Sequence, residues 1–332
     1  MAPILGGGPA GCPVAEILDA GASTLGRPEL RRAADHLAAP FRVQVDGRPG
    51  AGRSIVARAL HVAGVSVVGR DETPDIVVYV FVETLTPEDR DALSAIGQPC
   101  VAVLNKADLA GFGGPGPMVT AGARCRALGS TIAVPIVPVA ALLVRTSLDD
   151  AVFDGLAALA GGGTVPGGMP VKALLAELDL FGIAVAVEAL RFGAGREALA
   201  AELRRVSGIE ELIGALQRTA VEARYRRAAA ELAVLAGRAA DPGGRRIAEF
   251  LSGDALVLAR MASATAVLQA AGLSVSPGAT RVDCLQAAVA WLRYARGPVS
   301  DLHRACGADI ARGALRLWAR VPDGPESGHP RQ

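Results

Sequence analysis

The sequence predicts an α/β domain built on a doubly wound, mostly parallel sheet, followed by an all-α helical domain. Two observations carry the first half of this prediction. Strand and helix patterns alternate between residues 41 and 160, and the segment 75–83 contains an unbroken apolar run rich in β-branched residues. Such runs are typical of strands buried on both faces of a parallel sheet. The third observation is that the pattern beyond residue 170 is almost wholly helical.

The α/β half is predicted to begin with a helix over residues 28–39, where Pro28 occupies a first-turn position. Residues 1–27, rich in Gly, Ala and Pro, are interpreted as a flexible leader. The polar alternation of residues 41–46 is unusual for a central strand. The expected strands are 41–46, 65–68, 75–83, 99–104 and 132–139, and the expected helices between them are 54–63, 87–97, 118–128 and 147–160. Together, residues 28–160 form the predicted first domain.

The second half follows a segment whose composition is that of a linker, residues 161–170. A helical domain is predicted over residues 171–321, as a bundle of five or six helices separated by Gly/Pro breaks. Ser207 and Glu210 have the spacing of a capping box at the start of one of these helices. Residues 322–332 are expected to be a disordered tail.

Composition excludes several classes of protein. The chain has 332 residues, of which 51% are apolar and 20% charged, and its formal net charge is +1, so bulk charge does not suggest a nucleic-acid partner. The five cysteines are scattered, without the spacing of a metal site or a disulfide scaffold. The first residues lack a basic start and a long apolar run, so we expect no signal peptide and a cytoplasmic location. Peripheral contact with a membrane stays open.

The first chemical motif lies between the strand 41–46 and the helix 54–63. Residues 47–54 read Gly-Arg-Pro-Gly-Ala-Gly-Arg-Ser, which fits the phosphate-loop pattern G-x-x-x-x-G-K-[ST] except that Arg53 stands at the lysine position. Glycines let backbone N–H groups turn around an anion at a helix N-terminus. The phosphate-binding candidates are Gly47, Arg48, Pro49, Gly50, Ala51, Gly52, Arg53, Ser54 and Ile55, and Ser54 is also the candidate Mg²⁺ ligand. The alternative is a glycine-rich turn that binds nothing.

The second motif is Asn105-Lys106-Ala107-Asp108, at the end of a buried strand, where α/β folds place ligand-contacting loops. It fits N-K-x-D. An aspartate there can accept two N–H bonds from guanine, a pattern that adenine does not offer. Lys106 is one of only two lysines among 34 basic residues, which argues against an incidental match. The alternative is an ordinary polar helix start in which Asp108 is a cap.

In this order and spacing, the two motifs resemble the guanine-nucleotide-binding domain of Era-like and dynamin-like GTPases, a P-loop fold. The resemblance covers about residues 28–160 and implies GTP or GDP, with Mg²⁺, as cofactors. It implies that residues 47–54 hold phosphates and that Asn105, Lys106 and Asp108 read the base. Ala140 and Ala141 lie near a third base contact, although the serine usual there is missing. The helical half resembles the dynamin-like arrangement.

Two departures from that family bear on activity. The family's two switch segments should lie between the first helix and the strand 75–83, yet only residues 65–74 are found there. That segment has no D-x-x-G, and its sole threonine, Thr73, adjoins the strand, so the switches are interpreted as deleted. Arg53 adds a planar, forked cation where a compact ammonium belongs. No catalytic residue is therefore predicted.

The functional hypothesis is a degenerate GTPase-like protein that binds guanine nucleotide weakly without efficient hydrolysis. It would act as a regulatory or structural partner of another protein, in a homo- or hetero-oligomer, with an intact GTPase as one such partner. One alternative is a slow GTPase completed in trans by its partner. The other is an interaction scaffold that binds no nucleotide.

Overall fold

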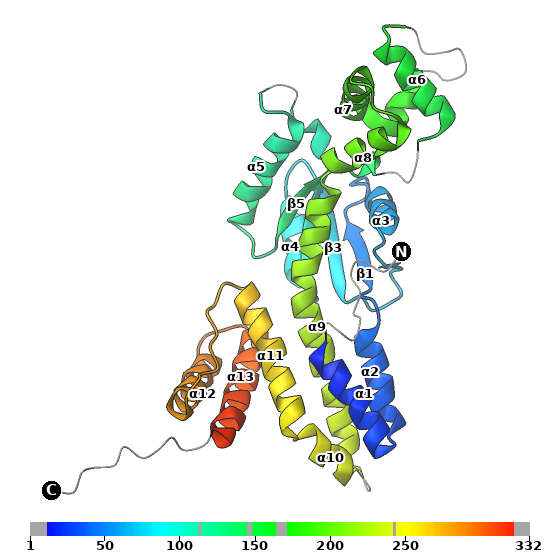
Figure 1. The fold of residues 1–332 in the computed structure, drawn as a ribbon. Coiled ribbons are helices and arrows are strands. Elements are labelled where there is room, and N and C mark those ends of the chain that lie inside the picture. The colour runs from blue at the N-terminus through cyan, green and yellow to red at the C-terminus, as the bar shows by residue number, and fades with distance from the viewer. Residues whose placement is uncertain (1–11, 112–113, 145–147, 164–170, 242–243, 322–332) are drawn as a thin grey trace, which may run out of the picture. The chain divides into compact units, whose positions relative to one another are not determined.

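The chain divides into two compact units (Figure 1). The structure, a computed structural model, describes residues 12–111, 114–144, 148–163, 171–241 and 244–321. We call residues 41–220 the sheet unit, and residues 12–40 together with 221–321 the helical unit.

The sheet unit contains a five-stranded, all-parallel sheet with the order β2-β1-β3-β4-β5. The strands are β1 (Val43–Gly47), β2 (Val67–Val68), β3 (Ile76–Val82), β4 (Cys100–Asn105) and β5 (Ile136–Val139). This confirms the predicted parallel sheet in an α/β arrangement. Because the strands are parallel, Gly47, Val82, Asn105 and Val139 all end at one edge, which we call the carboxyl edge.

The burial of the strands follows their sequence. In β3, six of the seven residues are buried, as the apolar run predicts. In β1 only Val43 is buried, because β2 pairs with Val43 and Gln44 alone and leaves the rest of β1 uncovered on that side. This explains the polar alternation of the first strand. Strand β5 starts at Ile136, later than predicted, and Pro138, which cannot donate to a ladder, fits its edge position.

Helices α3 (Arg53–Val62), α4 (Pro87–Ala95) and α5 (Pro117–Gly129) connect the strands. Helix α4 begins with a capping box, in which Thr86 Oγ1 accepts from the Asp89 N–H and the Asp89 carboxylate accepts from the Thr86 N–H. One face of the sheet, which includes Tyr79 and Phe81, packs against α4 and α5 in a single apolar cluster. The α3 helix contacts β1 and β2.

Three further helices belong to the sheet unit, α6 (Asp150–Ala160), α7 (Val171–Arg191) and α8 (Arg196–Val206), and they gather beside the strand ends in Figure 1. They pack around a 3₁₀ turn, Ala141–Leu143, that follows β5. At Gly182 of α7 an added Cβ would lie 2.4 Å from Leu143 Cδ2, so a larger residue there would have to displace the buried Leu143 side chain. The predicted boundary at 161–170, of which only 161–163 is described, therefore does not separate the two units. The chain divides at Ala220, within α9 (Ile209–Ala239).

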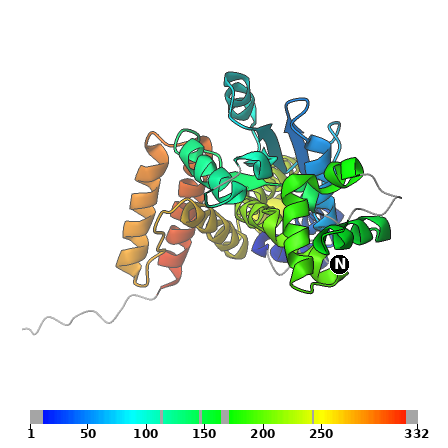
Figure 2. The same ribbon diagram turned by 90° about the horizontal axis from the view of Figure 1, so that it is seen from above.

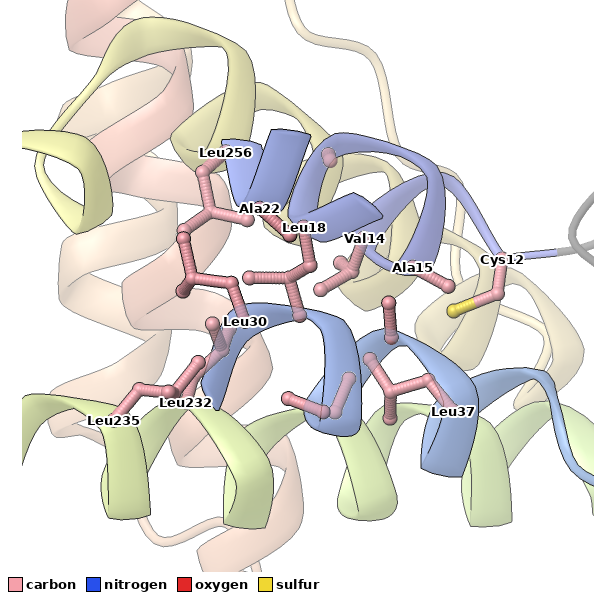
Figure 3. Packing of buried hydrophobic residues seen from close by; sticks show 14 residues of the cluster. Cys12, Val14, Ala15, Leu18, Ala22, Leu30, Leu37, Leu232, Leu235 and Leu256 are labelled. Atoms are coloured by element: carbon pink, nitrogen blue, oxygen red, sulfur yellow. The ribbon is translucent and has the colours of Figure 1, made fainter. Parts of the chain in front are cut away.

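The interpretation of residues 1–27 as a flexible leader is wrong for its described part. Residues Pro13–Leu25 form helix α1, which packs on α2 (Pro28–Ala38) in the helical unit (Figure 3). Val14, Leu18 and Ala22 recur at helical spacing and are buried beside Leu30, Leu232 and Leu256. Small residues that suggest a loose segment in sequence thus supply a helix face. Residues 1–11 lie outside the described part of the chain.

The rest of the helical unit comprises α10 (Arg245–Leu251), α11 (Asp254–Ala270), α12 (Arg281–Arg296) and α13 (Asp301–Arg320). Helices α12 and α13 run side by side (Figure 2). At Gly307 an added Cβ would lie 3.2 Å from Ala295 Cβ and from the Trp291 carbonyl, so small residues set this close approach. Within the described residues, seven helices follow residue 170 rather than five or six. The predicted tail, 322–332, lies outside the described residues.

The capping box predicted at residues 207–210 is also wrong. Ser207 Oγ accepts from the Ile209 N–H at 3.2 Å and donates to the Arg204 carbonyl, while Glu210 pairs with Arg204. A tight turn with φ +77° at Gly208 replaces the extended cap that the motif requires.

Among the described residues no single helix combines the length and apolar character needed to span a membrane, although α10 and α11, bent by 48°, meet that test as a pair.

Candidate functional site

The strand order places the predicted phosphate loop at the switch point of the sheet. From β1 the chain passes to β2 on one side and then crosses to β3 on the other. In open α/β sheets, ligands bind at the carboxyl edge where the winding reverses, because the two neighbouring loops diverge there. The loop that follows β1 at Gly47 therefore occupies the position at which this topology favours a ligand.

The three loop glycines all have positive φ values, but they differ in what an added Cβ would meet. An added Cβ at Gly47 (φ +140°) would lie 2.1 Å from the Val80 carbonyl oxygen, and one at Gly52 (φ +88°) would lie 2.4 Å from Asn105 Nδ2. Those two glycines are required by the packing of the protein itself. At Gly50 (φ +81°) an added Cβ meets nothing within 4 Å. The open side of the loop is therefore at Gly50.

Helix α3 begins directly after this loop, with Gly52 as its N-cap and without a side-chain cap bond. The Ile55 and Val56 N–H groups donate to the Gly52 carbonyl at 3.0 Å. The N–H groups of Arg53 and Ser54 belong to the first turn, which has no preceding carbonyl within the helix. Those two N–H groups and the helix dipole are the local features that favour an anion at this position.

The two loop arginines are both paired with carboxylates of the protein. Arg53 Nη1 lies 3.5 Å from Asp46 Oδ1, and the same oxygen also receives Arg70 Nη2 at 2.6 Å. Arg48 Nε lies 2.9 Å from Oδ1 of Asp89, which is fully buried. The sequence predicted these arginines as phosphate contacts, and it gave no sign of their carboxylate partners.

Asp89 also fixes the loop to the sheet beneath it. Tyr79 Oη donates to Asp89 Oδ1 at 2.9 Å, and burial together with this carboxylate raises the pKa of Tyr79 above its ordinary value. Asp89 therefore joins β3, the start of α4 and Arg48 of the loop. A buried carboxylate with three partners is a fixed structural element.

Asn105 holds the separate segments of the predicted site together. Its Nδ2 donates to the Ala51 carbonyl at 2.9 Å, and its Oδ1 accepts from the Ala141 N–H at 3.4 Å. The side chain is buried, with 3% of the residue exposed. The predicted phosphate loop, the N-K-x-D segment and Ala141 are therefore joined through one side-chain amide.

Ala140 and Ala141 are buried, and their backbone N–H groups are engaged within the protein. The Ala140 N–H donates to the Ser207 carbonyl at 2.8 Å, and the Ala141 N–H donates to Asn105. Gly208 follows Ser207, and an added Cβ there would lie 2.4 Å from the Pro138 carbonyl. These two alanines form part of the wall of the predicted site. Their N–H groups are not available as donors to a base. Sequence reasoning did not find Ser207 and Gly208 at this position.

Strained backbone is concentrated beside the same motif. Among the described residues, positive φ at a non-glycine residue occurs at Glu83, Lys106 and Asp179. Glu83 and Lys106 directly follow β3 and β4 at the carboxyl edge. Such conformations cost about 1–3 kcal/mol each and cluster at functional sites. The observation supports a functional role for this edge of the sheet.

Asp108 is buried, with 4% of the residue exposed, and the pKa of its carboxyl group is raised. Desolvation is the main cause of the raised pKa, and the negative charge of Asp179 adds to it, whereas a backbone hydrogen bond and the positive charge of Lys106 lower the pKa. Asp179 interrupts α7 with φ +58° and ψ +177°. An aspartate between two leucines in an otherwise helical pattern was the only sequence signal for this residue. The carboxylate of Asp179 therefore acts on the aspartate of the N-K-x-D segment itself.

We expect Asp108→Asn to increase the free energy of unfolding at pH 7. The folded-state pKa lies above the ordinary 3.8, so the folded protein binds more protons than the unfolded chain between these two values. The contribution of Asp108 to stability is therefore present below pH 3.8 and is lost as the pH rises through the folded-state pKa. The Asp108→Asn substitution removes this pH-dependent loss of stability, because asparagine does not ionise. Denaturant unfolding between pH 4 and 7 should show an advantage that shrinks as the pH falls.

Asp91→Asn, at an exposed position of α4, is the matched control and should change stability little at any pH. If Asp108→Asn destabilises the protein at pH 7, then the Asp108 carboxylate is held by favourable interactions, and the desolvation argument is wrong.

The described residues do not fit a magnesium site made by the protein alone. Ser54 is an exposed hydroxyl, and Asp46, the carboxylate that ends β1, is engaged by Arg53 and Arg70. Mg²⁺ prefers carboxylate and phosphate oxygens in octahedral geometry. Within the part of the chain that the structure describes, no group of three His, Cys, Asp or Glu side chains is placed to hold a metal. We therefore derive no step through a metal ion.

Comparisons of the chain with protein-family models, with curated proteins and with solved structures found no match.

Proposed function

We propose that the sheet unit is a P-loop guanine-nucleotide-binding domain, of the Era-like or dynamin-like kind, that has lost efficient hydrolysis. The observation that carries the proposal is the Asn105 side chain, which bonds to Ala51 in the phosphate loop and to Ala141 beside the base motif. A nucleotide places its phosphates and its base at a fixed separation. A buried amide that ties the two half-sites together holds them in that register.

The pairing of the loop arginines supports weak rather than tight binding. To contact a phosphate, Arg53 has to leave Asp46, and Arg48 has to leave the buried Asp89. Breaking the second pair leaves the buried Asp89 carboxylate with its hydrogen bonds but without a cation, which is costly. The phosphates would then depend mainly on the backbone N–H groups of the first turn of α3 and on the open side of the loop at Gly50.

The connection between β2 and β3 supports the absence of efficient hydrolysis. Val68 ends β2, and Ile76 begins β3 after seven residues. Arg70 in this connection pairs with Asp46, and the Arg42 N–H donates to the Asp75 carboxylate at 2.8 Å. Arg70 and the Asp75 carboxylate therefore both have partners within the protein. Hydrolysis requires a positioned water and stabilised charge, and we assign no residue of this connection to either task.

The test is the thermal midpoint of the purified protein with GTP and with ATP, together with titration of a fluorescent GTP analogue. Ligands that bind the folded state raise the midpoint by mass action. We expect GTP at millimolar concentration to raise it more than ATP does, because Asp108 can accept two N–H bonds from guanine only. Asp108→Asn should remove this difference while leaving the protein folded.

A second variant tests the phosphate end of the site. Arg53→Lys should increase GTP affinity several-fold, because an ammonium is compact and leaves room for the phosphates. Arg58→Lys, one turn further along α3 at an exposed position, is the matched control and should have no effect. If GTP gives no shift and no titration signal, with or without Mg²⁺, the nucleotide-binding proposal fails and the scaffold hypothesis takes its place.

The role as a partner of another protein, such as an intact GTPase, stays a prediction, as does completion of a slow GTPase in trans. Phosphate release separates these two. Release that remains at background for the protein mixed with each captured partner contradicts the trans-completed enzyme, whereas release above the partner's own rate supports it. Cytoplasmic location and peripheral membrane contact likewise stay predictions.

A further inference from the structure

The helical unit contains a cavity of about 520 Å³ lined by α9, α10, α11 and α13. Its lining divides by chemistry. One part is apolar and includes Ala239, Ala248 and Leu251; the other carries three arginines, Arg260, Arg312 and Arg316. Cavities of this volume are in the range that small organic ligands occupy.

A buried carboxylate fixes two of the arginines in place. Asp309 is 3% exposed and lines the cavity. It accepts from Arg260 Nη2 at 2.8 Å, from Arg312 Nη1 at 2.9 Å and from Tyr225 Oη at 2.9 Å. A buried carboxylate needs such partners to offset its desolvation. The consequence for the cavity is that its guanidinium groups are held in position before any ligand arrives.

The arginine side of the cavity has an excess of positive charge. Three arginines line it against one carboxylate. Asp254, beyond the lining, pairs with Arg316 at 3.4 Å and with Arg320 at 2.9 Å. Adding Asp254 and Arg320 to the count adds one charge of each sign, so the excess of positive charge stays at two. Arg312 is about half exposed and uses one Nη atom for Asp309. Its planar fork therefore keeps further donors for a second anion.

We propose that this cavity binds an organic anion that joins a phosphate or carboxylate group to a compact apolar group. The anionic group meets Arg312 and Arg316, because guanidinium forks match the oxygens of phosphate and carboxylate in a bidentate way. The apolar group lies on Ala239, Ala248 and Leu251. This site is independent of the nucleotide proposal, since every residue that lines it belongs to the helical unit.

The test is calorimetric titration of the full-length protein with three soluble probes, namely hexyl phosphate, inorganic phosphate and hexanol. We expect hexyl phosphate to bind at least tenfold more tightly than either half of the molecule, because it uses both parts of the lining. Vesicles of phosphatidylcholine with and without phosphatidic acid form a fourth arm. This arm distinguishes a lipid headgroup from a soluble ester as the source of the same chemistry.

Arg312→Gln combined with Arg316→Gln should weaken hexyl phosphate binding at least tenfold. The matched control is Arg304→Gln, on the same helix, where Arg304 is 53% exposed and pairs with Asp301 outside the cavity. It should leave the affinity within twofold of the unchanged protein. Circular dichroism and the thermal midpoint confirm that the variants are folded.

Ala248→Phe tests the apolar side without touching a charge. Position 248 is exposed on α10, so the helix can carry the larger side chain, which fills part of the cavity. Binding of hexyl phosphate should fall, and binding of inorganic phosphate should not. Even if the arginine variant fails to fold, the Ala248→Phe variant shows whether hexyl phosphate binds in this cavity.

Each outcome of these titrations either supports or overturns the proposal. Binding to acidic vesicles alone, lost in the arginine variant, supports the proposed chemistry with a lipid as its source. Hexyl phosphate binding that neither variant changes overturns the proposal. So does the absence of binding to both hexyl phosphate and acidic vesicles.

Discussion

Replacing Leu18 with alanine should lower the free energy of unfolding of the helical unit by about 3 kcal/mol, within the range measured for buried leucines. Leu18 is fully buried in α1 and packs in the cluster that includes Leu30, Leu232 and Leu256 (Figure 3). Truncation removes apolar contacts and leaves a cavity between α1 and the three helices α2, α9 and α11. Trp291 and Trp318, the only tryptophans, belong to the helical unit, so tryptophan fluorescence in a denaturant titration reports its unfolding.

The matched control is Leu285→Ala, which deletes the same atoms at a position of α12 that is 44% exposed. It should cost less than about 1 kcal/mol, because little apolar area returns to water. If the two substitutions cost the same, residues 12–27 are a loosely attached leader after all, and the packing of α1 described above is wrong.

Gly47→Ala should destabilise the sheet unit by about 4 kcal/mol, from overpacking and backbone strain of roughly 1–3 kcal/mol each. The added Cβ would lie 2.1 Å from the Val80 carbonyl oxygen and 2.9 Å from the Val80 carbonyl carbon and amide nitrogen. These are backbone atoms in the middle of β3, so they cannot rotate away. Hydrogen exchange of the peptide that contains β3, followed by mass spectrometry, measures the loss within this unit.

Gly50→Ala distinguishes a glycine that the fold requires from one that a ligand requires. Its φ of +81° is costly for alanine, by about 1–2 kcal/mol, but the added Cβ meets no atom within 4 Å. We therefore expect a mild loss of stability and a loss of any GTP-dependent thermal shift. A Gly50→Ala protein that binds GTP normally would show that phosphates do not approach the open side of the loop.

The features that the sequence predicted well are those set by local pattern. The apolar run of β3 and the start of helix α4 at Pro87 were placed correctly because each depends on residues close together in the chain. The loop at 47–54 and the segment 105–108 were found for the same reason, since strand ends and glycines mark them. Their meeting at one edge follows from a parallel sheet.

The partners of these residues could not be predicted. Arg53 reads as a phosphate contact in sequence, yet it pairs with Asp46, and Arg48 pairs with Asp89, forty-one positions away. Asn105 bonds to Ala51 across fifty-four positions. Such pairs form only when the sheet brings strand ends together, and no spacing rule encodes them.

By itself, the sequence determined a parallel α/β sheet with a glycine loop and an N-K-x-D segment at the ends of two of its strands, followed by helices. Only the tertiary structure decided that α1 and α2 belong to the helical unit and that α7 and α8 belong to the sheet unit. The physical reason is the alanine-rich composition. A helix covered with small apolar side chains can bury several of its faces, so its pattern does not specify the partner, and the partner is selected by long-range packing around large residues such as Leu18 and Leu143.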